Sequence, residues 1–311
     1  NLQSWNHVSF EDIGRIKATT NISFNSRKQN LLYISSFQNG LGVYDMSTNS
    51  IDIFNDTNTN VLQAVLPNDI RVNGVAFDSN GVGWLTNAGV NPILASVDQN
   101  NQFQTRPINV FTGASEDSYL KPIIDRNNTK WIGSRVSGVI AYNDTRGHKS
   151  TVIRTSEGLS SNTINNLALD YSNKLWIATS KGLRVINNVD QFLTQNEIKA
   201  SEIIFNFENN NQELFFEQNI LVITVDGSNN KWISVSDSGV FLIDDKNYGT
   251  IYNFTKENSP LPSNDVLDIE IDGTTGEVFF ATRLGVVSFK NYATTPTENL
   301  DDIKVYPNPV K

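Results

Sequence analysis

Short runs of alternating apolar and polar residues dominate this chain, and Gly, Asn and Asp separate one run from the next. The clearest runs are GVAFD (74–78), NLALD (166–170), ILVITVD (220–226) and VLDIEID (266–272). Alternation with a period of two is typical of half-buried strands, and clusters of Gly, Asn and Asp are typical of tight turns. Only residues 191–204 show a weak helical periodicity. The pattern therefore predicts an all-β protein built from hairpins.

The strands recur around an aromatic anchor at a nearly constant spacing of 51, 47, 45, 56 and 47 residues. The anchors are Tyr33, Trp84, Trp131, Trp176, Trp232 and Phe279. One strand precedes each anchor, a second follows it, a Gly leads into a third, and a fourth is more variable. This period fits one four-stranded propeller blade. We therefore predict a six-bladed β-propeller over residues 1–290, with seven blades as the alternative if residues 197–218 form a blade.

An Asp precedes five of the anchors by six residues, or by seven in the last case. These residues are Asp78, Asp125, Asp170, Asp226 and Asp272. A carboxylate in this position can accept hydrogen bonds from the N–H groups that follow it, which closes the first hairpin of the blade. The anchor ring is expected to fill the wedge between blades. The Gly is expected to permit positive φ or a close approach at the second hairpin. We interpret all three positions as structural.

The two ends of the chain differ from the repeat. Residues 4–10 (SWNHVSF) have no anchor but resemble a fourth, outer strand, and the last blade, 265–290, shows only three strands. Pairing the two would close the propeller and remove exposed sheet edges. Residues 291–303 are polar and acidic and contain Pro, which indicates a linker. Residues 304–311 (KVYPNPVK) then begin a further segment.

Composition narrows the classes of function. The chain has 24 basic and 33 acidic residues and a net charge of −9, which argues against nucleic acid as a partner. It has no cysteine, which excludes disulfides, thiolate zinc sites and cysteine nucleophiles. His7 and His148 are the only histidines, too few by themselves for a zinc site of the usual ligand count. The acidic turns lack the spaced carboxylates of a calcium loop. We predict no cofactor, no metal site and no catalytic residues.

One group of cations could still form a binding surface. In the predicted blades, the loop between the second and third strands lies on the same face as the start of each innermost strand. The cations at these positions are Arg71, Lys121, Arg135, Lys181 and Arg283. Together they would attract an acidic glycan or the acidic surface of a partner. A chance distribution of 24 basic residues over two faces is the alternative explanation.

Several stretches together resemble the second propeller of the PorZ family, a surface component of the type IX secretion machinery of Bacteroidetes. They are RVNGVAFDSNG (71–81), PIIDRNNTKWIG (122–133), ITVDGSNNKWISVSDSGVFLI (223–243), FTKENSPLPSND (254–265) and TGEVFFATRLGVVSF (275–289). The ending YPNPV (306–310) resembles the start of the C-terminal sorting domain of type IX cargo, so residues 304–311 are interpreted as a truncated sorting domain. The blade motif is also similar to that of sensor propellers in hybrid two-component systems.

The resemblance implies a location and partners. PorZ-like proteins lie at the outer membrane surface, in an attachment complex with a sortase-type protease, and help to transfer cargo onto anionic lipopolysaccharide. The family motif supplies no catalytic residues, so the resemblance implies a non-enzymatic binding module. A periplasmic sensor propeller that binds an oligosaccharide is the alternative. A glycan-active lyase or hydrolase is a third reading, and it would need an acid–base cluster in the central channel.

Overall fold

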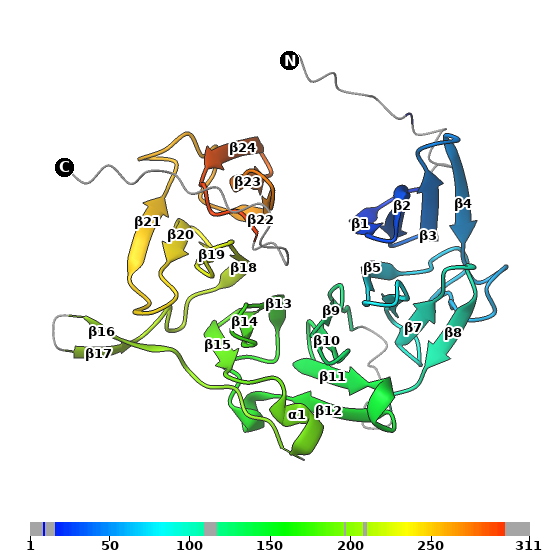
Figure 1. The fold of residues 1–311 in the computed structure, drawn as a ribbon, viewed down its shortest axis with the longest axis horizontal. Coiled ribbons are helices and arrows are strands. Elements are labelled where there is room, and N and C mark those ends of the chain that lie inside the picture. The colour runs from blue at the N-terminus through cyan, green and yellow to red at the C-terminus, as the bar shows by residue number, and fades with distance from the viewer. Residues whose placement is uncertain (1–8, 10–15, 109–116, 196, 208–209, 296–311) are drawn as a thin grey trace, which may run out of the picture. The chain divides into compact units, whose positions relative to one another are not determined.

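The structure is a computed structural model, and it describes residues 9, 16–108, 117–195, 197–207 and 210–295. The chain divides into two compact units, Asn1–Ile220 and Leu221–Lys311. Each unit is built from antiparallel sheets whose strands lie in chain order (Figure 1). The described residues contain one short α-helix, α1 (Gln191–Thr194), and two 3-10 helices, Asp144–Arg146 and Thr155–Glu157.

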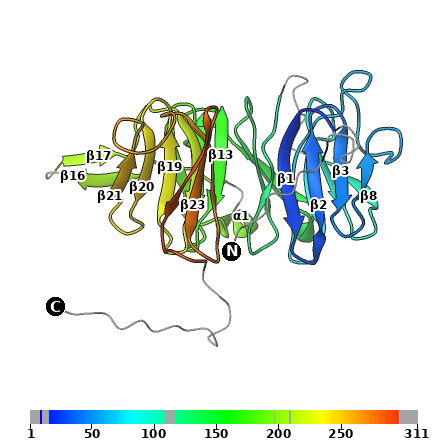
Figure 2. The ribbon, with the colours of Figure 1, turned by 90° about the horizontal axis from the view of Figure 1, so that it is seen from above.

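The first unit contains four sheets, which we call blades 1 to 4. Blade 1 consists of β1 (Thr19–Asn25), β2 (Lys28–Ser36), β3 (Gly40–Asp45) and β4 (Ser50–Phe54). Blade 2 consists of β5 (Val72–Phe77), β6 (Gly83–Asn87), β7 (Leu94–Val97) and β8 (Phe103–Arg106). Blade 3 consists of β9 (Ile123–Ile124), β10 (Lys130–Gly133), β11 (Val139–Asn143) and β12 (Lys149–Ile153). Blade 4 consists of β13 (Ile164–Leu169), β14 (Leu175–Thr179) and β15 (Gly182–Ile186). Figure 2 shows β1, β2 and β3 side by side.

The second unit contains two further sheets, blades 5 and 6. Blade 5 consists of β18 (Ile220–Val225), β19 (Lys231–Val235), β20 (Gly239–Ile243) and β21 (Thr250–Phe254), and the first residue of β18 ends the first unit. Blade 6 consists of β22 (Val266–Ile271), β23 (Glu277–Thr282) and β24 (Gly285–Lys290). Six sheets of one repeating plan make this fold a six-bladed β-propeller. The described part of the longest interval holds a hairpin, β16 (Ile204–Phe207) and β17 (Asn210–Glu213), and not a seventh blade.

Two blades have three strands each within the described residues, as the sequence predicted for 265–290 but not for blade 4. In blade 4, α1 and an extended segment, residues 197–203, take the place of an outer strand, and Ser201 of this segment forms a bridge with Val185. Blade 6 has three strands within the described residues. The predicted closing strand, residues 4–10, lies outside the described residues except for Ser9. Residues 296–311, the rest of the predicted linker and the predicted sorting domain, also lie outside them.

The repeated Asp closes a turn and also holds the anchor ring. In blade 3, Asp125 Oδ1 accepts the backbone N–H groups of Asn127 and Thr129, both at 2.9 Å. Its Oδ2 accepts the indole N–H of Trp131 at 3.0 Å. Asp78 and Asp170 do the same for Trp84 and Trp176. One carboxylate therefore joins the turn to the side chain that fills the blade interface.

The fifth repeat departs from this arrangement. Asp226 still accepts the backbone N–H groups of Ser228 and Asn230 at 2.9 Å. Its Oδ2, however, accepts the side-chain amide of Asn291 at 3.1 Å, and Asn291 follows β24. The indole N–H of Trp232 is buried and has no hydrogen-bond partner among the described residues. Asn291, in the segment after β24, thus donates to the carboxylate oxygen that accepts the indole N–H in the repeats of Trp84, Trp131 and Trp176.

Within each unit, anchor rings pack against an element that follows their own blade. Tyr33 of blade 1 meets Phe77 of blade 2 edge-on, with ring centroids 4.7 Å apart. Trp131 of blade 3 meets Phe192 of α1 edge-on at 5.8 Å. Five of the six anchors are almost completely buried: Tyr33, Trp84, Trp131, Trp176 and Trp232. A large flat ring buries much apolar area with few rotatable bonds to fix, which suits a wedge-shaped gap.

Phe279, the sixth anchor, is different because 39% of its surface is exposed. Its neighbour Phe280 is buried and packs against Trp232, with ring centroids 5.4 Å apart. The turn that Asp272 opens is one residue longer than the turn that Asp226 opens, and Phe279 follows its Asp by seven residues where Trp232 follows by six. Phe279 therefore still occupies the strand position of an anchor. Among the described residues, blade 6 is the last sheet of the second unit.

A buried lysine joins blades 2 and 3. The side chain of Lys130 is fully buried, and its Nζ donates to Asp144 Oδ1 at 2.6 Å. The same Nζ lies 3.6 Å from the centroid of the Trp84 ring, within the range of a cation–π interaction. Burial lowers the pKa of Lys130, and the hydrogen bond to Asp144 opposes that shift. The ammonium group is therefore held between an anion and an aromatic face.

Lys130→Met is expected to change how stability depends on pH. The pKa of folded Lys130 lies below the ordinary value of 10.5, so between these two values the unfolded chain binds more protons than the folded chain. The free energy of unfolding of the wild type must therefore rise relative to the variant as pH increases through that window. Urea denaturation of both proteins from about pH 7 to the ordinary lysine pKa measures the difference. Two parallel pH curves would contradict the prediction.

The described part of the chain contains no helix long and apolar enough to cross a membrane.

Candidate binding sites

The loops that follow the second strands lie beside the starts of the innermost strands. The backbone N–H of Arg135 donates to the carbonyl of Ser118 at 2.9 Å, and the N–H of Ala88 donates to the carbonyl of Arg71 at 2.8 Å. In blade 4, the N–H of Ser180 donates to the carbonyl of Thr163 at 3.2 Å. We call this side of the first unit the loop face, and the side with the Asp turns the turn face.

Two of the predicted cations are already engaged within the chain. Arg71 forms an ion pair with Asp69 at 2.6 Å, and the Asp69 carboxylate raises the pKa of Arg71. The guanidinium of Arg71 also lies 5.8 Å from the ring centroid of Phe37. Lys121 is half-buried and packs over Gly74, where an added Cβ would lie 2.6 Å from the Cβ of Lys121. The charge of Arg71 on the loop face is therefore neutralised by Asp69. The side chain of Lys121 packs against the neighbouring blade at Gly74.

Two other cations lie exposed on neighbouring blades of the loop face. Arg135 of blade 3 donates from Nη1 to Asn165 Oδ1 at 2.6 Å, so this partner is neutral. Asn165 in turn donates to the backbone carbonyl of Ile220 at 2.7 Å. Lys181 of blade 4 is exposed, and its ammonium forms no ion pair with any described residue. Arg283 is exposed between β23 and β24 of the second unit.

A buried carboxylate fixes the loop that carries Arg135. Asp117 is 2% exposed, and its Oδ2 accepts the hydroxyls of Ser134 at 2.6 Å and Ser137 at 2.8 Å. Burial, reinforced by the Asp117 charge, raises the pKa of Tyr119. Sequence reasoning missed Asp117 because its role depends on a strand end 17 residues further along the chain. A rigid loop reduces the entropy lost when Arg135 binds an anion.

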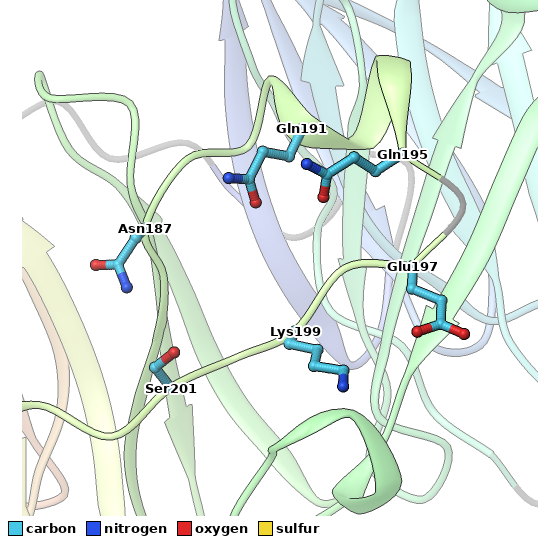
Figure 3. Close-up of a pocket in the computed structure, with 6 residues that line it drawn as sticks. All are labelled: Asn187, Gln191, Gln195, Glu197, Lys199 and Ser201. Carbon is cyan, nitrogen blue, oxygen red and sulfur yellow. The ribbon is translucent and has the colours of Figure 1, made fainter.

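A second feature of the first unit is a hollow of about 540 Å³ beside blade 4. Figure 3 shows its lining, which we call the polar hollow: Asn187, Gln191, Gln195, Glu197, Lys199 and Ser201. It exists because blade 4 has α1 in place of a regular outer strand. Asn187 follows β15, Gln191 and Gln195 belong to α1 and its end, and the other three belong to the extended segment 197–203. The weak helical periodicity of 191–204 and the longest anchor interval were the only sequence signals for it.

The walls of the polar hollow are anchored in the core. Phe192 and Ile198 are buried in the same hydrophobic cluster as Trp131. Asp190, directly before α1, accepts a hydrogen bond from Asn173 at 2.8 Å and forms an ion pair with Arg126, and its pKa is lowered chiefly by the hydrogen bond from Arg126. The segment is therefore held in place by buried apolar contacts and by partly exposed polar contacts.

His148, the histidine within the described residues, shows no arrangement for catalysis. His148 Nδ1 is hydrogen-bonded to the hydroxyl of Tyr142 at 2.7 Å, and its backbone has φ of 57° in a turn. His7 lies outside the described residues. No group of three or more His, Cys, Asp or Glu side chains within the described ranges is arranged to hold a metal ion.

Comparison with known proteins identifies the architecture. Neither a protein-family profile nor a curated protein matches the sequence. Among solved structures, PorZ, an essential surface component of the type IX secretion system of Porphyromonas gingivalis, superposes with a TM-score of 0.79 at 23% identity. PorZ shares this fold. The match covers 94% of this chain but 41% of the PorZ chain, so this chain spans less than half of that protein.

Two further propellers are similar over most of this chain. The extracellular domain of a putative hybrid two-component system from B. thetaiotaomicron has a TM-score of 0.60 at 18% identity, covering 90% of this chain and 34% of that chain. A putative gluconolactonase has a TM-score of 0.55 at 10% identity, covering 90% of each chain. At these identities the likeness shows the fold, and the fold is shared by a secretion-system component, a two-component system domain and a putative enzyme.

Proposed function

We propose that this propeller is a non-enzymatic binding module of a type IX secretion attachment complex at the outer membrane surface. The quoted segments, the ending YPNPV (306–310) and the likeness to PorZ support this proposal. Its partners would be the other proteins of the complex, including a sortase-type protease, and its ligand the anionic lipopolysaccharide that receives cargo.

The observation that carries the proposal is the pair of exposed cations on the loop face. Arg135 and Lys181 have no acidic partner among the described residues, although the chain as a whole has a net charge of −9. Two uncompensated cations on neighbouring blades create a local positive potential on an otherwise acidic protein. An anionic glycan or an acidic partner surface is the chemistry that such a face would attract.

The double variant Arg135→Glu/Lys181→Glu is expected to bind anionic lipopolysaccharide about tenfold more weakly than the wild type, because attraction becomes repulsion. The measurement is binding of the purified chain to immobilised lipopolysaccharide at low and physiological salt. The control variant is Arg146→Glu/Lys246→Glu, which shifts the net charge equally but at the turns that follow β11 and β20. Equal losses in both double variants would mean that total charge, and not the loop face, governs binding.

A sensor propeller that binds an oligosaccharide is the second candidate, favoured by the likeness to the extracellular domain of the two-component system. The same binding assay separates the two. A propeller of the attachment complex would lose binding of lipopolysaccharide when Arg135 and Lys181 are changed, whereas glycan binding by a sensor propeller would not depend on these two cations.

A further inference from the structure

The side chains of the polar hollow are open to solvent: Ser201 is half-buried and the other five are exposed. Asn and Asp side chains elsewhere cap turns or join blades, as Asn143 and Asn165 do. In contrast, none of the six lining side chains forms a hydrogen bond or an ion pair with another described residue. Figure 3 shows them gathered from three chain segments around one space. Exposed polar groups that line one hollow and have no partner within the described residues are available to a ligand.

The lining chemistry selects for a particular class of ligand. The three carboxamides of Asn187, Gln191 and Gln195 and the hydroxyl of Ser201 both donate and accept hydrogen bonds. Glu197 only accepts and Lys199 only donates, and their charges cancel. An anion would meet Glu197, a cation would meet Lys199, and an apolar group would leave polar atoms unpaired. A ligand with many hydroxyl groups satisfies donors and acceptors together.

We propose that the polar hollow binds a neutral, hydroxyl-rich ligand, a carbohydrate. Its volume of about 540 Å³ lies within the range of small-molecule sites. No aromatic side chain of the described residues lines it, so binding would depend on hydrogen bonds and not on stacking. The buried contacts of Phe192 and Ile198 hold the site in shape before binding. The proposal is independent of the loop-face cations, which belong to different segments of the chain.

The test is a titration followed by backbone amide signals in two-dimensional NMR. The neutral probes are methyl α-mannopyranoside, N-acetylglucosamine and rhamnose, and the charged probes are galacturonic acid and glucosamine. At least one neutral sugar should shift the amide signals of residues 187–201 in a saturable way. Both charged sugars should bind more weakly than that neutral sugar, because each places a like charge beside Glu197 or Lys199.

Gln191→Ala/Gln195→Ala is expected to weaken binding of the neutral sugar about tenfold, because the variant removes two side chains that donate and accept hydrogen bonds. Ala favours helix, so α1 should persist. The control is Gln63→Ala/Gln218→Ala, which removes two exposed carboxamides outside the hollow and should leave binding unchanged. The proposal is overturned if no neutral sugar shifts the amides of 187–201, if a charged sugar binds equally well, or if the α1 variant keeps wild-type affinity. Loss of binding here with lipopolysaccharide binding intact would separate this site from the loop face.

Discussion

Asp125→Ala is expected to lower the free energy of unfolding by about 3–5 kcal/mol. Asp125 is 6% exposed, and its carboxylate accepts three N–H groups, from Asn127, Thr129 and the indole of Trp131. Both Thr129 and Trp131 are fully buried, so the substitution leaves their donors without an acceptor and without water. The loss reaches further than one turn, because the same carboxylate holds the ring that packs against Phe192. Urea denaturation monitored by circular dichroism measures this change in the free energy of unfolding.

Asp272→Ala provides the matched control for this prediction. Asp272 opens the corresponding turn of blade 6 and accepts the N–H of Thr274 at 2.9 Å and the hydroxyl of Thr275 at 2.7 Å. The Asp272 side chain is exposed and holds no indole, so water can replace what the carboxylate provides. Asp272→Ala should therefore lower the free energy of unfolding much less than Asp125→Ala does. Comparable losses at both positions would show that turn closure alone, and not the bond to the indole, gives the Asp its importance.

Gly138→Ala is expected to cost about 3–4 kcal/mol of the free energy of unfolding. Gly138 opens the third strand of blade 3 with φ of 90°, a conformation that costs an L residue about 1–2 kcal/mol. An added Cβ would also lie 2.1 Å from the backbone oxygen of Ile153, at the end of the fourth strand. Because that neighbour is backbone, it can move only if β11 and β12 shift against each other. Thermal and urea denaturation of the purified variant would measure the cost.

Gly147→Ala separates the two causes of that cost. Gly147 also has positive φ, at 65°, but an added Cβ there would meet nothing within 4 Å. Its substitution should therefore cost only the conformational part, about 1–2 kcal/mol. If Gly138→Ala proved no more harmful than Gly147→Ala, the close approach to Ile153 would not matter for stability.

Sequence reasoning identified part of the candidate sites. It placed Arg135 and Lys181 on the loop face, because strand order alone determines which loops share a side. It could not reveal that Asp69 compensates Arg71, since pairing depends on how two side chains of one loop turn toward each other. The polar hollow was missed for a different reason. It follows from a strand that is replaced by α1, and a repeat pattern describes only the strands that are present.

The role of the repeated Asp was only half predicted. The spacing suggested a turn, and the backbone bonds at Asp78, Asp125, Asp170 and Asp226 match it. The bond from the carboxylate to the indole requires the ring to lie back across the turn, and a spacing of six residues does not specify a side-chain direction. At Trp232 the same spacing gives no such bond within the described residues.

By itself, the sequence determined the plan of the blades and favoured six of them, because turns, anchors and glycines act over a few residues and repeat with each blade. Tertiary structure alone decided which chemically equal side chains are engaged and which remain available. Asp226 accepts a hydrogen bond from Asn291, 65 residues away. The six side chains that line the polar hollow come from three segments of the chain. Burial and pairing of this kind depend on residues far apart in the chain, and their positions are known only once the blades have packed.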